Sequence, residues 1–151
     1  MKFIVDRTVG KLGKYLRMLG FDVIYDPGGS REEMAARASN EERVILTRSQ
    51  KNLGKGDPRG IRSVGSDNPR DQLAEVLGHF RLKPGANRFF SRCLFCNEEL
   101  LPLAKERAEG KVPDFIYQAY DSFHLCPRCQ RIYWPGTHYR RMKEDLAKIV
   151  E

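Results

Sequence analysis

Residues 2–20 read Lys-Phe-Ile-Val-Asp-Arg-Thr-Val-Gly-Lys-Leu-Gly-Lys-Tyr-Leu-Arg-Met-Leu-Gly, a short apolar run followed by a segment of helical period. The run at residues 2–6 predicts a short buried strand. In residues 8–19, apolar side chains recur at spacings of three and four, at Val9, Leu12, Leu16 and Leu19. This spacing predicts a helix that buries one face, and Gly20 is placed to end it.

The alternation of strand and helix continues along the chain. Apolar runs at residues 23–25, 44–47 and 61–64 predict three more strands. The run at residues 44–47 has no polar alternation, as expected for a strand buried on both faces of a parallel sheet. Helical spacing is found again in residues 31–40 and 69–80.

Polar residues mark where both of these helices begin. Ser30 precedes the first helix and Glu33 stands three residues later, which is the spacing of a capping box. Either Asp67 or Asn68 is suited to cap the second helix ahead of Pro69. The order strand, helix, strand, helix, strand, strand, helix predicts an α/β fold with a mostly parallel sheet.

The stretch Lys83-Pro84-Gly85-Ala86-Asn87 has the composition of a linker between domains. It divides the chain into an α/β domain at residues 1–84 and a second domain at residues 88–151. A polar helix from about residue 139 to residue 149 is expected to close the second domain.

The composition restricts the compartment and the partners. No stretch approaches the roughly 18 apolar residues of a membrane span, and the charged first residues do not resemble a signal peptide, so a cytoplasmic protein is expected. The net charge is +7, from 27 basic and 20 acidic residues. This excess favours a polyanionic partner such as nucleic acid, although a basic surface can also serve solubility alone.

Two Cys-x-x-Cys pairs lie in the predicted second domain, at Cys93, Cys96, Cys126 and Cys129. Each pair can form a tight turn that directs two sulfurs towards one ion, and two such turns complete a tetrahedral zinc site. A thioredoxin-like redox motif explains one pair but not the other. Four sulfurs leave no open coordination position, so the zinc is expected to be structural, and His124 and His138 are not needed as ligands.

Asp6 ends the first predicted strand, at the edge of the sheet where open α/β folds bind ligands. Other side chains follow the later strands and reach the same edge, namely Asp26, Glu32, Glu33, Ser49 and Asp67. Clustered carboxylates of this kind hold Mg²⁺ or Mn²⁺, which can activate water against a phosphodiester. The alternative is that these acids only cap helices and solubilise the surface.

The first predicted helix carries basic residues opposite its leucines, at Arg7, Lys11, Lys14 and Arg17. Such a face can hold phosphates. It can equally be the solvated side of an amphipathic helix, and the sequence leaves both interpretations open.

Two segments together resemble a known family. The first runs from Phe3-Ile4-Val5-Asp6-Arg7-Thr8-Val9-Gly10-Lys11-Leu12 through residues 15–22, and the second is Cys126-Pro127-Arg128-Cys129 continuing to His138. They resemble the PIN-like RNase domain with a C-terminal zinc ribbon that is named after the C-terminal region of the mutator-seven exonuclease. The resemblance implies a three-layer α/β/α domain, a zinc ribbon and metal-dependent cleavage of RNA.

Carried over by position, the resemblance implies that Asp6 is the first metal-binding acid and that Glu32 or Glu33 is the second. The third position differs, because Thr47-Arg48-Ser49 stands where the family typically has Thr-Arg-Asp. A neutral hydroxyl cannot replace the charge of a carboxylate at a Mg²⁺ site. Asp57 or Asp67 would have to substitute, and neither has the matching position.

RNA contacts are expected from the basic helix face and from Arg48, Trp134, His138 and Arg140. Aromatic side chains of residues 133–139 can stack bases. They can also form a hydrophobic cap that packs the ribbon against the first domain. The leading hypothesis is an RNA-acting protein whose ribonuclease activity Ser49 weakens. The alternatives are a non-catalytic RNA-binding module and a zinc-ribbon protein–protein adaptor.

Overall fold

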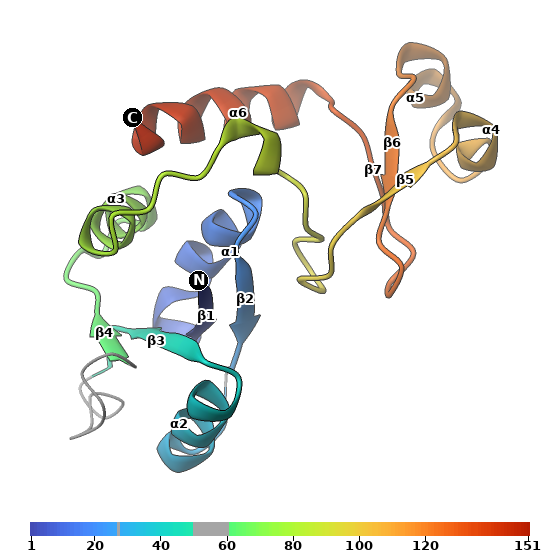
Figure 1. The fold of residues 1–151 in the computed structure, drawn as a ribbon. Coiled ribbons are helices and arrows are strands. Elements are labelled where there is room, and N and C mark those ends of the chain that lie inside the picture. The colour runs from blue at the N-terminus through green and yellow to red at the C-terminus, as the bar shows by residue number, and fades with distance from the viewer. Residues whose placement is uncertain (27, 50–60) are drawn as a thin grey trace.

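The computed structural model describes residues 1–26, 28–49 and 61–151. Its main sheet contains β1 (Lys2–Val5), β2 (Asp22–Tyr25), β3 (Arg43–Thr47) and β4 (Ile61–Ser63), as Figure 1 shows. The strand order is β2-β1-β3-β4, and every pair is parallel. The predicted α/β fold with a parallel sheet is therefore confirmed, and β1 and β3 are its central strands.

Helices cover both faces of this sheet. A short 3-10 turn (Arg7–Val9) leads into α1 (Gly10–Met18), and both α1 and α3 (Pro69–His79) pack over the face that carries Phe3 and Val5. Helix α2 (Arg31–Asn40) packs over the other face, where Ile4 is buried. Burial on both faces explains why the central strands β1 and β3 show no polar alternation.

The helix termini follow the sequence signals. The Ser30 hydroxyl accepts a hydrogen bond of 3.1 Å from the backbone N–H of Glu33. Asn68, rather than Asp67, caps α3, because its side-chain oxygen accepts from the N–H groups of Arg70 and Asp71. Helix α1 ends in a Schellman motif at Gly20, which has a φ of +93°.

A smaller antiparallel sheet forms beyond the turn at Ala86–Arg88. It contains β5 (Leu101–Leu103), β6 (Phe123–Leu125) and β7 (Ile132–Tyr133) in the order β5-β6-β7. The long interval between the cysteine pairs forms β5, two short helices, α4 (Lys105–Ala108) and α5 (Asp114–Ala119), and β6. A separate apolar cluster of Ala108, Val112 and Phe123 holds this unit together.

Helix α6 (Thr137–Val150) returns from the small unit to the α/β unit, as Figure 1 shows. Its Leu146 is fully buried in the same core as Phe3 and Leu73, and Phe89 joins that core as well. The C-terminal helix therefore packs with residues of the predicted first domain, across the expected boundary. None of the described helices has both the length and the apolar character that a membrane crossing requires.

Candidate functional site

The two cysteine pairs adopt the same backbone geometry. The residue after each pair, Asn97 or Gln130, has a left-handed φ, 67° and 64° respectively. Its N–H donates a 2.9 Å hydrogen bond to the carbonyl oxygen of the first cysteine, Cys93 or Cys126. In each pair the N–H of the second cysteine also points at the first sulfur, at 3.4 and 3.5 Å. Each pair is thus a tight turn with both sulfurs on one side.

The four sulfurs converge on one point. The Sγ atoms of Cys93, Cys96, Cys126 and Cys129 all lie within 4.8 Å of one another. The Cys93 and Cys129 sulfurs are 3.7 Å apart. A tetrahedron with Zn–S bonds of about 2.3 Å has edges of about 3.8 Å, so the spacing fits. All four are free thiols, and the cluster can hold a metal ion such as zinc.

Neighbouring groups act differently on the individual thiols. Burial, together with hydrogen bonds to the other cysteines, raises the pKa of Cys96 to about 12. Burial also raises the pKa of Cys129, but hydrogen bonds from the backbone and side chain of Arg131 prevail and lower it to about 6. The Tyr133 hydroxyl lies 3.0 Å from the Cys93 sulfur and accepts a hydrogen bond from the Leu94 N–H. It therefore orients the first turn from outside the cluster.

The first cysteine turn is bonded to the α/β unit. The Arg17 guanidinium donates 2.8 Å hydrogen bonds to the carbonyl oxygens of Val23 and Leu94. The Asn97 side chain accepts from the Val23 N–H and donates to the Asp22 carboxylate. The cysteine cluster and strand β2 are consequently parts of one hydrogen-bond network.

Asp6 lies at the carboxyl end of central strand β1 and is only 5% exposed. One carboxylate oxygen accepts from the N–H and hydroxyl of Thr8, and the other accepts from the Thr47 hydroxyl. Each of these hydroxyl oxygens also accepts a 2.9 Å hydrogen bond from a backbone N–H. The Thr8 hydroxyl accepts from Arg48, and the Thr47 hydroxyl accepts from Ser49. The turn at residues 48–49 is thereby fixed directly beside the Asp6 carboxylate.

The other predicted acids are more exposed to solvent than Asp6. Glu32 and Glu33 are exposed in the first turn of α2, and the Asp26 carboxylate accepts from the Gly29 N–H. Asp67 is exposed before α3, and Asp57 lies outside the described residues. Among the residues with described positions, only the four cysteines form a group of three or more potential metal ligands. Asp6 is thus the one buried acid at this edge of the sheet in the described part of the chain.

The basic residues separate into two groups. Arg7, Lys11 and Lys14 are exposed along the 3-10 turn and α1, and Arg48 and Arg140 are also exposed. Arg17 does not share this exposed face, because its guanidinium is bonded inside the structure.

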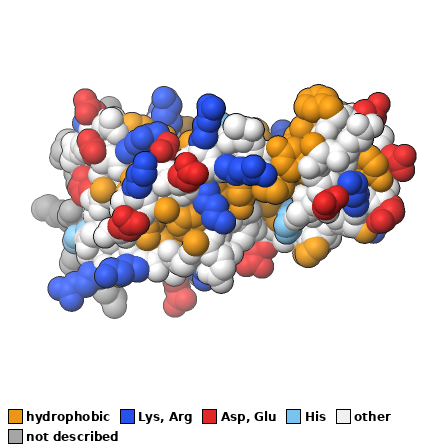
Figure 2. Space-filling model, turned by 90° about the horizontal axis from the view of Figure 1, so that it is seen from above, with side chains coloured by type: hydrophobic (Ala, Val, Ile, Leu, Met, Phe, Trp, Pro, Cys, Tyr) orange, Lys and Arg blue, Asp and Glu red, His pale blue; other side chains and the backbone are white. Residues whose placement is uncertain are grey.

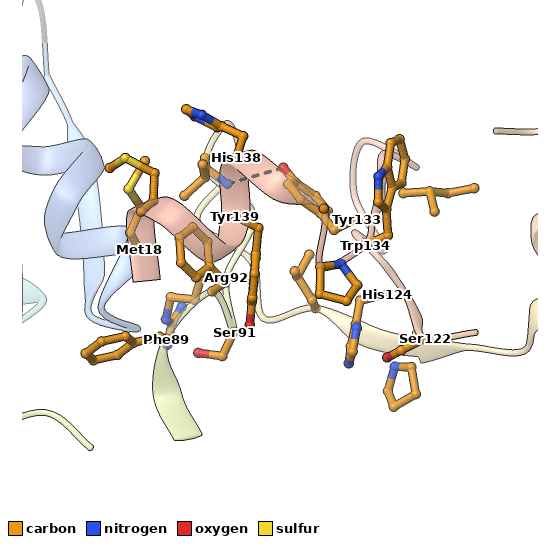
Figure 3. Close-up of a pocket in the computed structure, with 18 of the residues that line it drawn as sticks. Met18, Phe89, Ser91, Arg92, Ser122, His124, Tyr133, Trp134, His138 and Tyr139 are labelled. Atoms are coloured by element: carbon orange, nitrogen blue, oxygen red, sulfur yellow. Dashed lines mark hydrogen bonds between the residues drawn. The ribbon is translucent and has the colours of Figure 1, made fainter. Parts of the chain in front are cut away.

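Trp134 and His138 line a cavity of about 740 Å³ between the α/β unit and the small unit, as Figure 3 shows. His124 lines the same cavity. Neither His124 nor His138 is among the potential metal ligands that gather at the four cysteines. The predicted aromatic segment therefore borders the cavity, and through Tyr133 it also contacts the cysteine cluster.

A family model described as the Mut7-C RNAse domain matches residues 1–146. The chain belongs to the Mut7-C RNase domain family. The resemblance found in the sequence is confirmed, and the match extends over both units rather than the α/β unit alone. Comparisons with curated proteins and with solved structures find no match for this Mut7-C domain.

Sequence reasoning missed several residues that organise this Mut7-C domain. Thr8 and Thr47 hold the Asp6 carboxylate, and both belong to the segments compared with the family. Asn97 directly follows a cysteine pair, and asparagine is the residue other than glycine that most readily adopts a left-handed φ. That preference was a usable signal for Asn97. No sequence signal pairs Tyr133 with Cys93.

Proposed function

We propose that this Mut7-C domain is a metal-dependent ribonuclease whose α/β unit is a PIN-like domain and whose small unit is a zinc ribbon. The observation that carries the proposal is the buried Asp6 carboxylate at the carboxyl end of a central parallel strand. Ligands of open parallel sheets collect at this edge. Three hydrogen-bond donors from Thr8 and Thr47 orient the carboxylate.

The donor set fits a divalent cation in part. Asp6 would hold Mg²⁺ or Mn²⁺, with Glu32 or Glu33 from the first turn of α2 as the second acid. The bound ion would neutralise charge on the phosphate and lower the pKa of a water. The reaction is hydrolysis: a water oxygen bonds to phosphorus, one phosphodiester P–O bond breaks, and the proton passes to the leaving oxygen. Ser49 supplies no third carboxylate, so weak activity is expected.

The zinc ion proposed for the four cysteines has a structural role. Four thiolates fill its coordination, which leaves no position for water or substrate. The hydrogen bonds of Arg17 and Asn97 connect its first turn to β2. Zinc is therefore proposed to support the α/β unit as well as the small unit.

A second candidate is a non-catalytic RNA-binding module. Ser49 favours it, as does the finding that no three carboxylates gather among the described residues. In this case the α/β unit would be a platform, and RNA binding would be indifferent to Asp6→Asn and to added Mg²⁺.

A cleavage assay on total RNA with Mn²⁺ distinguishes the ribonuclease from the non-catalytic RNA-binding module. For the ribonuclease, wild-type protein cuts RNA and Asp6→Asn abolishes cutting, while Glu109→Gln, which removes an exposed acid of the small unit, leaves it intact. Asp6→Asn must retain the melting temperature of the wild type for this comparison. Equal cutting by wild type and Asp6→Asn would contradict the proposal.

A further inference from the structure

The cavity between the two units has one wall from each unit. Met18 and Phe89 line it on the α/β side, and Trp134 and His124 come from the small unit, as Figure 3 shows. Helix α6 contributes Tyr139 between them. Lys14 of α1 also lines the cavity. The cavity is separate from the Asp6 carboxylate, which does not line it.

Its walls offer aromatic rings with polar edges. Trp134, Tyr139 and His124 are half-buried, and Tyr139 is backed by Phe90 with ring centroids 4.4 Å apart. The imidazole side chains of His124 and His138 have no hydrogen-bond partner in the described part of the chain, so their nitrogens can bond to a ligand. Half-exposed aromatic rings are the surfaces on which unpaired bases stack.

The charge of the walls favours an anionic ligand. No described Asp or Glu lines the cavity, whereas Lys14 and Arg92 do. Arg92 is engaged with the carbonyl oxygens of Gly20 and Asn97, so Lys14 is the cation available to a ligand. Viewed from the α6 side, Figure 2 shows hydrophobic side chains exposed between the two parts of the molecule, with Lys and Arg side chains beside them.

A row of basic side chains connects this cavity to Asp6. Arg7, Lys11 and Lys14 are exposed at spacings of four and three, so they share one face of the 3-10 turn and α1. The row begins at the residue after Asp6 and ends at the cavity wall. At about 1.5 Å per residue it spans about 10 Å, which gives a backbone a path between the two places.

We propose that the cavity binds the unpaired bases of a single RNA strand, whose phosphates follow Arg7, Lys11 and Lys14 towards Asp6. This inference rests on the proposed action on RNA and adds a binding site for the strand beside the cleavage centre. Bases in an A-form duplex are paired and stacked, so they cannot enter the cavity. The occupant is therefore a single strand.

Trp134 is the single tryptophan of the chain and therefore reports on the cavity directly. The test is a fluorescence titration of the full chain, without added Mg²⁺ or Mn²⁺, with a single-stranded RNA of about twelve nucleotides. The same strand annealed to its complement is the comparison. The single strand should quench Trp134 and bind more tightly than the duplex, with an affinity that falls as salt rises.

Variants locate the phosphate path. Lys14→Ala should weaken single-strand binding severalfold and reduce the slope of log affinity against log salt by about 0.7. Lys111→Ala removes the same charge from an exposed position of the small unit and should change neither quantity. Equal effects of the two substitutions would contradict the path along α1.

The outcomes also separate this inference from the ribonuclease proposal. Quenching by the single strand without any RNA cleavage supports the cavity site and contradicts the enzyme. Cleavage without quenching contradicts the cavity site and leaves the enzyme standing. The inference is overturned if the single strand and the duplex quench the fluorescence of Trp134 equally. It is also overturned if the fluorescence falls without RNA because the protein self-associates.

Discussion

The side-chain oxygen of Asn97 accepts a 2.9 Å hydrogen bond from the backbone N–H of Val23, which lies 74 residues earlier in the chain. The same side chain donates a 2.7 Å hydrogen bond to Asp22. Asn97 is at the same time the left-handed residue that closes the first cysteine turn. One residue therefore shapes the cysteine cluster and joins it to the edge of the main sheet.

The first prediction concerns this residue. Asn97→Gly keeps the left-handed backbone but leaves the buried Val23 N–H without its partner, which should lower the free energy of unfolding by about 1–3 kcal/mol. The measurement is urea unfolding of zinc-loaded protein. Gln130→Gly is the matched control, since Gln130 has the same backbone role and an exposed side chain. Equal losses in both variants would show that Asn97 does not act through Val23.

The second prediction concerns the metal. Purified protein should contain one equivalent of zinc, and Cys126→Ser should lose most of it. Because the cluster supports β2, the variant should also unfold at a clearly lower temperature. His124→Ala, which alters a histidine outside the cluster, should keep its zinc. Metal analysis with thermal unfolding checks both, and less than half an equivalent in the wild type would contradict the zinc assignment.

The third prediction is a pH dependence. Burial acts to raise the pKa of Asp22, but hydrogen bonds from Arg43 and Asn97 prevail and hold that pKa below its ordinary value. A lowered carboxyl pKa stabilises the fold above the unfolded-state value of about 3.9, and the stabilisation disappears as the pH falls through the folded-state value. Asp22→Asn should thus be destabilising at pH 7, and its difference from wild type should shrink in acid. A difference that stays constant down to about pH 3 would refute this.

The fourth prediction concerns the close contact at Gly20. A Cβ at this position would lie 2.5 Å from the Arg88 carbonyl oxygen, and the φ of +93° is strained for any other residue. Gly20→Ala should therefore lower the free energy of unfolding by at least about 1–3 kcal/mol. Gly78→Ala in α3 meets no atom within 4 Å and should be neutral or stabilising by up to about 1 kcal/mol. Chemical denaturation of the two variants measures both effects.

The α/β unit was predictable because its signals are local. Ser30 and Asn68 cap their helices through side-chain hydrogen bonds within three residues, and the apolar runs match the strands closely. Beyond residue 88 the sequence predicted the cysteine site and the polar helix that forms α6, but not the small sheet, since strands of two or three residues are too short to show a period. The packing of Leu146 into the main core depends on contacts distant in sequence, which no local pattern encodes.

The same distinction applies to the site. Asp6 was identifiable because it ends a recognisable strand, and the four cysteines because of their spacing. Arg17 has the helical position of a solvent-facing base, yet its guanidinium bonds to Leu94 on the first cysteine turn. The sequence cannot reveal that bond, because it depends on how the two units pack. The same packing creates the cavity beside Trp134.

The last prediction concerns Ser49, whose N–H donates to the Thr47 hydroxyl that in turn donates to Asp6. Ser49→Asp places a second negative charge beside the first, which should strengthen binding of Mn²⁺ and increase RNA cleavage. Without the ion, repulsion between the carboxylates should lower the melting temperature, and Mn²⁺ should restore it more than in the wild type. Ser49→Asn has a similar shape without the charge and should show neither effect. If Ser49→Asp and Ser49→Asn behave alike in both cleavage and Mn²⁺-dependent melting, position 49 does not contribute to a metal site with Asp6.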